Sequence, residues 1–159
     1  MGNGTTTVAL FFNALREEPK EEGMSIDHKA EYEHIKRIAQ RYFVDPRFIL
    51  AIRCAEDGGP GREFGVLSIS APTWDDQCRA TCLSVLNAVI RGLDLHVNIL
   101  QALSDRCKFE YTPSFIRLFA ARWAPEDAAN DPNQLNSNWA RNVSLIYAQL
   151  LANRSDYQP

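Results

Sequence analysis

Residues 45–61 read DPRFILAIRCAEDGGPG, a segment with a helix start signal, an apolar body and a glycine-rich end. Asp45 followed by Pro46 is a typical helix N-cap followed by the first helical position. The apolar body then runs to Glu56, and the glycines begin two residues later. We therefore expect a short buried helix that the glycines terminate.

The position of Glu56 makes its carboxyl group unusual. Helical spacing places it on the same face as Ile49 and Ile52, which is the face that a helix normally buries. A carboxylate in the last helical turn also meets the negative end of the helix dipole. Burial and the dipole both penalise the ionised form, so both are expected to raise the pKa of Glu56. Such a group suits general acid catalysis, and the alternative is a solvated residue at an ordinary helix end.

The rest of the chain also has helical periodicity. Apolar side chains recur at three- and four-residue steps over segments at about 27–44, 73–90, 93–103, 112–124 and 137–150. Thr73, Thr112 and Ser137 are the expected N-caps of three of these segments. Residues 62–70 alternate weakly, which is typical of a short extended segment or a loop lining a cleft. We predict an all-α fold with little or no β-sheet.

The chain of 159 residues suits one domain with one hydrophobic core. Residues 2–7 are loop-like, and residues 17–23 are charged and interrupted by proline and glycine. We therefore expect residues 1–25 to be a leader or an arm that docks on a protein partner, with residues 8–16 as a short helix or the docking segment. Residues 26–159 are then the single folded domain.

The composition argues against two classes of partner. The net charge is −3, whereas a general nucleic-acid binder needs a basic surface, so we expect no nucleic acid. No apolar stretch approaches the length of a membrane span. The apolar run at residues 8–12 is too short for a secretory signal. We therefore expect synthesis in the cytoplasm without a Sec-type signal.

The four cysteines are Cys54, Cys78, Cys82 and Cys107. Without an export signal, free thiols are expected rather than disulfides. The three histidines show no metal-ligand spacing with these cysteines, so we predict no structural metal and no cofactor.

The order of the segments points to a known family. A helix ends in RYFVDP (41–46), and the next helix delivers Glu56. FGVLSI (64–69) follows, and FAARWAP (119–125) and NWARNV (138–143) come near the C-terminus. This order resembles the lysozyme-like superfamily, specifically the soluble lytic transglycosylase and goose-type lysozyme branch, which includes phage-borne peptidoglycan-cleaving domains. The resemblance covers residues 28–151 and implies a compact helical domain with a cleft.

Position by position, the resemblance puts the catalytic acid at Glu56. It puts Gly65, Leu67 and Ser68 on the segment that lines the sugar cleft, and Trp123 where the family has a tyrosine near the glutamate. Three residues depart from the family pattern, because Asp57 replaces a serine, Ser68 a glutamine and Trp123 a tyrosine. The candidate substrate-binding residues are Asp57, Phe64, Gly65, Leu67, Ser68, Trp74 and Trp123. For the aromatic ones, core packing is the alternative.

The implied substrate is the glycan strand of peptidoglycan. Glu56 would protonate the glycosidic oxygen between N-acetylmuramic acid and N-acetylglucosamine, and the muramoyl 6-hydroxyl would then attack to give a 1,6-anhydro product. A hydrolase would instead need a second carboxylate, for which Asp57, Asp75 and Asp76 are candidates and Glu63 is less favoured. Asp75 and Asp76 also suit the first turn of a helix, so the mechanism with one acid is preferred.

Two other classes of function stay open. The first is a lysozyme-like module without catalysis, which binds glycan or serves as a structural or assembly part of a phage or secretion apparatus. The second is a helical adaptor with no role at glycans. If the protein is instead the peptidoglycan-cleaving enzyme, we expect it to act at the bacterial cell wall after delivery by phage lysis, a virion or a secretion apparatus.

Overall fold

The computed structural model of the chain describes residues 26–67, 71–92, 111–126, 128–129 and 135–159. In these ranges it has five α-helices and no strand, so the prediction of an all-α fold is confirmed. The predicted helix over 93–103 and the proposed arm at 1–25 lie outside the described residues. The helices are α2 (Ile26–Tyr42), α3 (Pro46–Glu56), α4 (Trp74–Gly92), α6 (Pro113–Trp123) and α7 (Trp139–Ala152), with the 3-10 helix η2 (Leu135–Asn138) before α7.

Helix starts follow the local signals in the sequence. The backbone N–H of Arg47 donates to Asp45 Oδ1 at 2.9 Å, and that of Phe115 donates to Thr112 Oγ1 at 3.2 Å. Thr73 caps α4 in the same way through its hydroxyl. Each cap satisfies a backbone donor that has no partner inside its own helix, which is why these short motifs predict where a helix begins.

Two local predictions need correction. Ser137 is not the N-cap of the last helix, because η2 carries the chain directly into α7. The cap position falls on Asn138, whose side chain makes no capping hydrogen bond. The described part of the weakly alternating segment, 62–67, forms turns and irregular loop rather than a strand.

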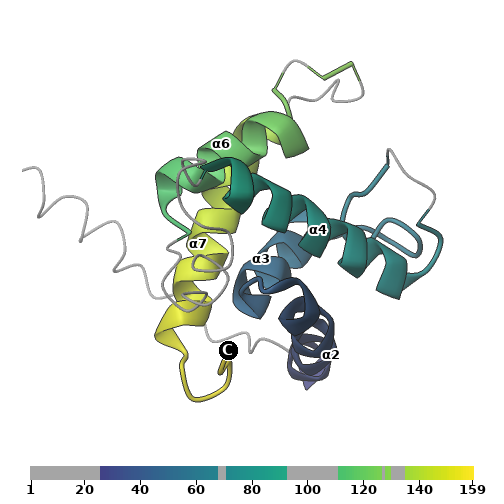
Figure 1. The fold of residues 1–159 in the computed structure, drawn as a ribbon, viewed down its shortest axis with the longest axis vertical. Coiled ribbons are helices and arrows are strands. Elements are labelled where there is room, and N and C mark those ends of the chain that lie inside the picture. Colours follow the sequence, from purple (N-terminus) through teal and green to yellow (C-terminus); the bar gives the residue numbers. More distant parts are fainter. Residues whose placement is uncertain (1–25, 68–70, 93–110, 127, 130–134) are drawn as a thin grey trace, which may run out of the picture.

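Helix α3 is the centre of the fold. It contacts α7, α2 and α4, and in Figure 1 it lies between α7 on one side and α2 on the other. Its residues from Phe48 to Ile52 are all buried. Phe48 is surrounded by four aromatic rings with centroids 4.5 to 6.2 Å away, those of Tyr111, Phe115, Phe119 and Tyr147. Burying one such side chain contributes roughly 1.5–3 kcal/mol, so this cluster anchors α3 against α6 and α7.

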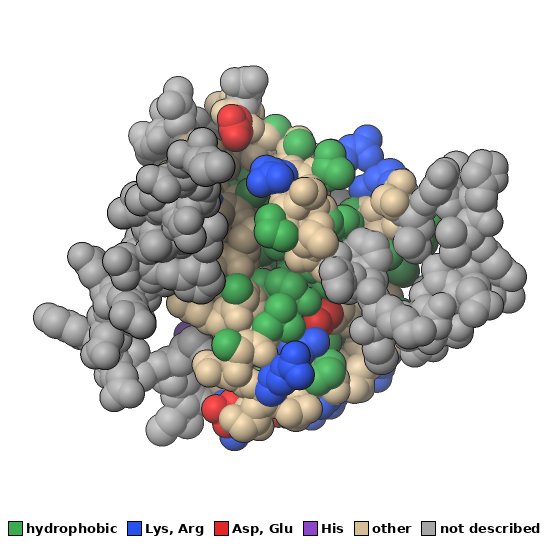
Figure 2. Space-filling model, turned by 90° about the vertical axis from the view of Figure 1, so that its left-hand side faces the viewer, with side chains coloured by type: hydrophobic (Ala, Val, Ile, Leu, Met, Phe, Trp, Pro, Cys, Tyr) green, Lys and Arg blue, Asp and Glu red, His purple; other side chains and the backbone are tan. Residues whose placement is uncertain are grey.

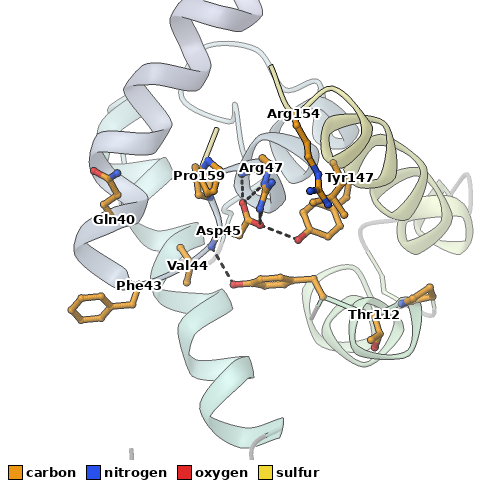
Figure 3. A pocket seen from close by; sticks show the side chains of 13 residues that line it. Gln40, Phe43, Val44, Asp45, Arg47, Thr112, Tyr147, Arg154 and Pro159 are labelled. Atoms are coloured by element: carbon orange, nitrogen blue, oxygen red, sulfur yellow. Dashed lines mark hydrogen bonds and ion pairs between the residues drawn. The ribbon is translucent and has the colours of Figure 1, made fainter. Parts of the chain in front are cut away.

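Helices α3 and α7 run antiparallel and are joined by polar contacts at both ends. At the start of α3, the Tyr147 hydroxyl donates to Asp45 Oδ2 at 3.0 Å (Figure 3). At its end, the indole N–H of Trp139 donates to Glu56 Oε1 at 2.8 Å. The two contacts fix the register of the helix pair, and so they fix where Glu56 lies.

The surface is of mixed character. On the face drawn in Figure 2, hydrophobic side chains gather near the centre, with acidic and basic side chains beside them. A helix long and apolar enough to cross a membrane does not occur in the described part of the chain.

Candidate functional site

Three helices meet at the carboxyl group of Glu56. This residue ends α3, and its Oε1 atom accepts a hydrogen bond from the indole N–H of Trp123 and another from that of Trp139, each 2.8 Å long. Trp123 is the last residue of α6, and Trp139 is the first of α7. The carboxyl group is therefore held in place by two rigid aromatic rings.

The pKa of Glu56 is raised above its ordinary value. Burial is the largest cause, and the hydrogen bonds from Trp123 and Trp139 act in the opposite direction because they favour the charged form. The direction is the one that the sequence predicts from helical spacing. A carboxyl group in this state keeps its proton to higher pH than an exposed glutamate does.

The two oxygens of the carboxyl group have different roles. An indole N–H only donates, so Oε1 stays an acceptor and the proton of the neutral acid belongs on Oε2. Oε2 lies directly over Gly65, where an added Cβ atom would come within 2.2 Å of it. Gly65 also has a φ of +69°, which favours glycine. The loop thus approaches Oε2 closely because it has no side chain there.

Glu56 opens into a cavity of about 540 Å³. This volume lies within the range of small-ligand sites. The walls come from the loop after α3, one face of α4, the end of α6 and the segment after it. The wall residues include Gly65, Leu67, Ser84, Asn87, Arg122 and Trp123. A second cavity of about 350 Å³ shares the last four of these, so the two hollows are neighbours between α4 and α6.

The side chain of Gln77 on α4 holds the loop that follows α3. Its side chain is only 1 % exposed, and its amide nitrogen donates to the carbonyls of Gly61, Val66 and Ala71 at 3.0 to 3.2 Å. Its amide oxygen accepts from the backbone N–H of Val66 at 3.2 Å. A buried amide that satisfies several loop groups fixes the loop without regular secondary structure. Gln77 is not among the site residues predicted from the sequence, and its place among mostly apolar positions on the buried face of α4 is the signal that could have found it.

The structure brings some predicted residues together and separates others. Gly65, Leu67 and Trp123 line the same cavity as Glu56. Phe64 is fully buried with its ring packed edge-on against Trp74, 5.2 Å between centroids. This corrects the expectation that Phe64 stacks on a sugar, since the core-packing alternative leaves no exposed ring face.

Trp74 lies away from the cleft. Its indole N–H donates to Glu31 on α2 at 3.3 Å, and its ring packs against His34. It does not line the cavity of Glu56, so the structure gives it a role between α2 and α4 instead. Ser68 lies outside the described residues.

The candidate second carboxylates lie outside the cavity wall. Asp57 is the C-cap of α3, an exposed residue with a φ of +44°. Asp75 pairs with His34 at 2.8 Å and Asp76 accepts from the Thr73 hydroxyl at 2.6 Å, both in the first turn of α4. These contacts fit the alternative that Asp75 and Asp76 are ordinary residues of the first turn of a helix. Glu63 accepts from a backbone N–H of its own loop.

A larger cavity of about 850 Å³ lies at the opposite end of α3 (Figure 3). The acidic side chain of this cavity, Asp45, is already paired, because it forms an ion pair with Arg47 at 2.7 Å and accepts from the Tyr147 hydroxyl. Size alone would favour this cavity as the site. Its internal pairing leaves no acid with a free oxygen, so Glu56 is the better candidate for chemistry.

The cysteines follow the sequence expectation where they are described. Cys78 and Cys82 are buried free thiols on α4, and Cys54 is a free thiol whose pKa burial raises to about 11. Cys107 lies outside the described residues. Among the residues that the structure describes, no group of three or more His, Cys, Asp or Glu could hold a metal ion.

Comparison with known proteins adds no family assignment. No family model matches the chain, and neither a curated protein nor a solved structure matches it.

Proposed function

We propose that the protein cleaves the glycan strand of peptidoglycan between N-acetylmuramic acid and N-acetylglucosamine, with Glu56 as the general acid and base. One observation carries the proposal, namely a partly buried carboxyl group with a raised pKa and one oxygen without a hydrogen bond to a described residue, on a residue that lines a cavity. A second support is the position of Trp123, because the resemblance in the sequence expects an aromatic residue from that segment beside the catalytic glutamate.

In the proposed reaction, the proton on Glu56 Oε2 passes to the glycosidic oxygen as that bond breaks. The carboxylate left behind is stabilised by the indole N–H groups of Trp123 and Trp139, which already point at Oε1. The same carboxylate then takes the proton of the muramoyl 6-hydroxyl, which attacks the anomeric carbon and closes the 1,6-anhydro ring. No water molecule is consumed, and Glu56 ends the cycle protonated.

The surroundings of Glu56 favour this single-acid route over hydrolysis. Among the described residues that line the cavity, Glu56 is the one carboxylate. A two-carboxylate mechanism needs its partner within about 5–10 Å across the scissile bond. Asp75 and Asp76 are engaged by His34, Arg79 and Thr73 instead. Lytic transglycosylase activity is therefore preferred to lysozyme activity.

One observation favours a module without catalysis as the second candidate. Glu56 joins α3 to both α6 and α7 through its indole contacts, so the same carboxyl group serves as a structural link. A glutamate kept for this link alone would leave the cleft able to bind glycan without cutting it.

Digestion of purified sacculi separates the candidates. The released fragments are identified by mass spectrometry, and 1,6-anhydro ends are expected from a transglycosylase whereas reducing ends indicate a lysozyme. Glu56→Gln keeps an acceptor oxygen for both indoles but has no acid proton, so it should lower the rate at least 100-fold.

Glu33→Gln is the matched control, because Glu33 is an exposed glutamate on α2. It should cleave like the wild type. Cleavage that survives in Glu56→Gln rejects the catalytic assignment. Sacculus binding without any cleavage by the wild type supports the module instead.

A further inference from the structure

Two arginines face the second cavity, beside the cleft of Glu56. Arg91 comes from the last turn of α4, and Arg122 comes from the last turn of α6. Both are exposed, and Arg122 lines the cavity of Glu56 as well. The two arginines thus line one hollow of about 350 Å³ that shares part of its wall with the cavity of Glu56.

Neither arginine has an acidic partner in the described residues. Arg47, Arg53 and Arg79 each form an ion pair with an aspartate or glutamate. No ion pair or side-chain hydrogen bond joins Arg91 or Arg122 to another described residue. Arg141 and Arg154 also have no ion pair with a described residue, but Arg91 and Arg122 differ from them because they line the same cavity.

The chemistry of this cavity suits an anion. A guanidinium group stays charged at all relevant pH values, and its planar fork binds a carboxylate through two parallel hydrogen bonds. Ser84 and Asn87 add a hydroxyl and an amide to the same wall, and the ring of Trp123 closes it beside Glu56. Two like charges in one hollow repel each other, and an anion between them removes that repulsion.

We propose that this cavity is a subsite for a carboxylate of the acidic peptide that branches from the glycan strand. This inference rests on the proposed function, since the branch leaves the muramoyl sugar next to the bond that Glu56 would break. A strand that carries its peptides reaches both cavities at once, whereas a bare strand occupies only the cleft of Glu56. The protein therefore selects peptide-bearing strands.

Binding of a soluble stem peptide tests the subsite without any turnover. The probe is the tetrapeptide L-Ala-γ-D-Glu-diaminopimelate-D-Ala, titrated into the full-length protein by isothermal calorimetry. Arg91→Gln and Arg122→Gln should each weaken binding about tenfold, because each removes one charge-assisted contact. Arg141→Gln, an exposed arginine on α7 that borders neither cavity, should bind like the wild type.

Two further binding measurements identify the anion. The same peptide with its carboxylates amidated should fail to bind. Inorganic phosphate that binds as tightly as the peptide would overturn the assignment to a carboxylate. Binding of the peptide that is absent, or unchanged in both arginine variants, would overturn the subsite.

A turnover measurement separates failure of the inference from failure of the proposed function. Intact glycan strands and strands stripped of peptides by an amidase are compared by kcat/KM. Faster cleavage of the intact strands, lost in Arg91→Gln, supports the subsite, and equal rates on both reject it while leaving the function in place. Cleavage of neither strand rejects the function, and the peptide titration then decides the subsite alone.

Discussion

Trp123 tunes the acid strength of Glu56. Its indole N–H stabilises the charged carboxylate and so works against the effect of burial. Trp123→Phe keeps a ring that can stack on Phe119 but removes the donor. We expect the pKa of Glu56 to rise further, because the charged form loses a hydrogen bond. A general acid is active while protonated, so the alkaline limb of the pH–rate profile should move to higher pH.

The measurement is kcat/KM on solubilised glycan strands across the pH range, since this ratio reports the free enzyme. Phe119→Leu changes the same stack without touching the donor and serves as the control. An alkaline limb that stays in place or moves to lower pH in Trp123→Phe would contradict the assignment of this limb to Glu56.

Gly65 is the second residue whose identity the site depends on. Gly65→Ala would place a Cβ atom 2.2 Å from Glu56 Oε2, and it would do so at a φ of +69°. We expect a destabilisation of about 1–3 kcal/mol and a displaced carboxyl group with little activity. Gly59→Ala is a matched control, because a Cβ there meets nothing within 4 Å. Urea unfolding and the cleavage assay measure both effects, and equal behaviour of the two variants would refute the close approach.

Single residues also mark how far the sequence could predict the site. Glu56 is predictable because its burial follows from Ile49 and Ile52 on the same short helix. Its partner Trp139 is 83 residues away, in a segment for which the periodicity predicts only a helix with an apolar face. Nothing in local spacing distinguishes an indole that fills a core from one that donates to a buried acid, because that depends on how two distant helices pack.

Among the helices, α3 is the one whose position determines the site. The hydroxyl of Tyr147 holds its first turn through Asp45, while Glu56 lies at its other end. Burial and the charge of Asp45 raise the pKa of Tyr147, so the hydroxyl stays protonated and donates. Tyr147→Phe should therefore cost about 1.5 kcal/mol of stability, since Asp45 keeps Arg47 but loses one donor.

Tyr42→Phe is the control for this change, because the Tyr42 hydroxyl makes no hydrogen bond with the described residues. Both variants are compared by urea unfolding and by the pH–rate profile. Tyr147→Phe should lower stability and leave the alkaline limb where it is, since Glu56 is remote from the lost contact. Unchanged stability would show that α3 is held by packing alone.

Local sequence predicts where some helices start, but it does not predict the path of the loop after α3. Asp45-Pro46 and Thr112-Pro113 predict two helix starts because a cap and a proline act within one turn. The path of 61–67 is not predictable from local sequence, because it depends on hydrogen bonds to Gln77 on another helix. Ser137 failed as a cap for a related reason, since η2 had already begun the turn.

For the whole molecule, the raised pKa of Glu56 links folding to pH. The folded state holds this proton to higher pH than the unfolded chain, where the ordinary value is 4.5. The contribution of Glu56 is therefore fully present below about pH 4.5 and is lost as the pH rises through the folded pKa, because the folded state must then accommodate a partly buried charge. Stability that depends on this group falls with rising pH.

Glu56→Gln removes this proton while keeping the shape of the side chain. The two proteins share every other titrating group, so those contributions cancel in the difference between their unfolding free energies. We expect the wild type to lose stability relative to Glu56→Gln as the pH is raised from 4 toward 8, measured by urea unfolding at each pH. Glu33→Gln, at an exposed site, should track the wild type throughout. A difference that is flat with pH would mean that the indole hydrogen bonds balance burial, and one that grows in favour of the wild type would mean that they outweigh it. In either case Glu56 would be a poor acid at neutral pH.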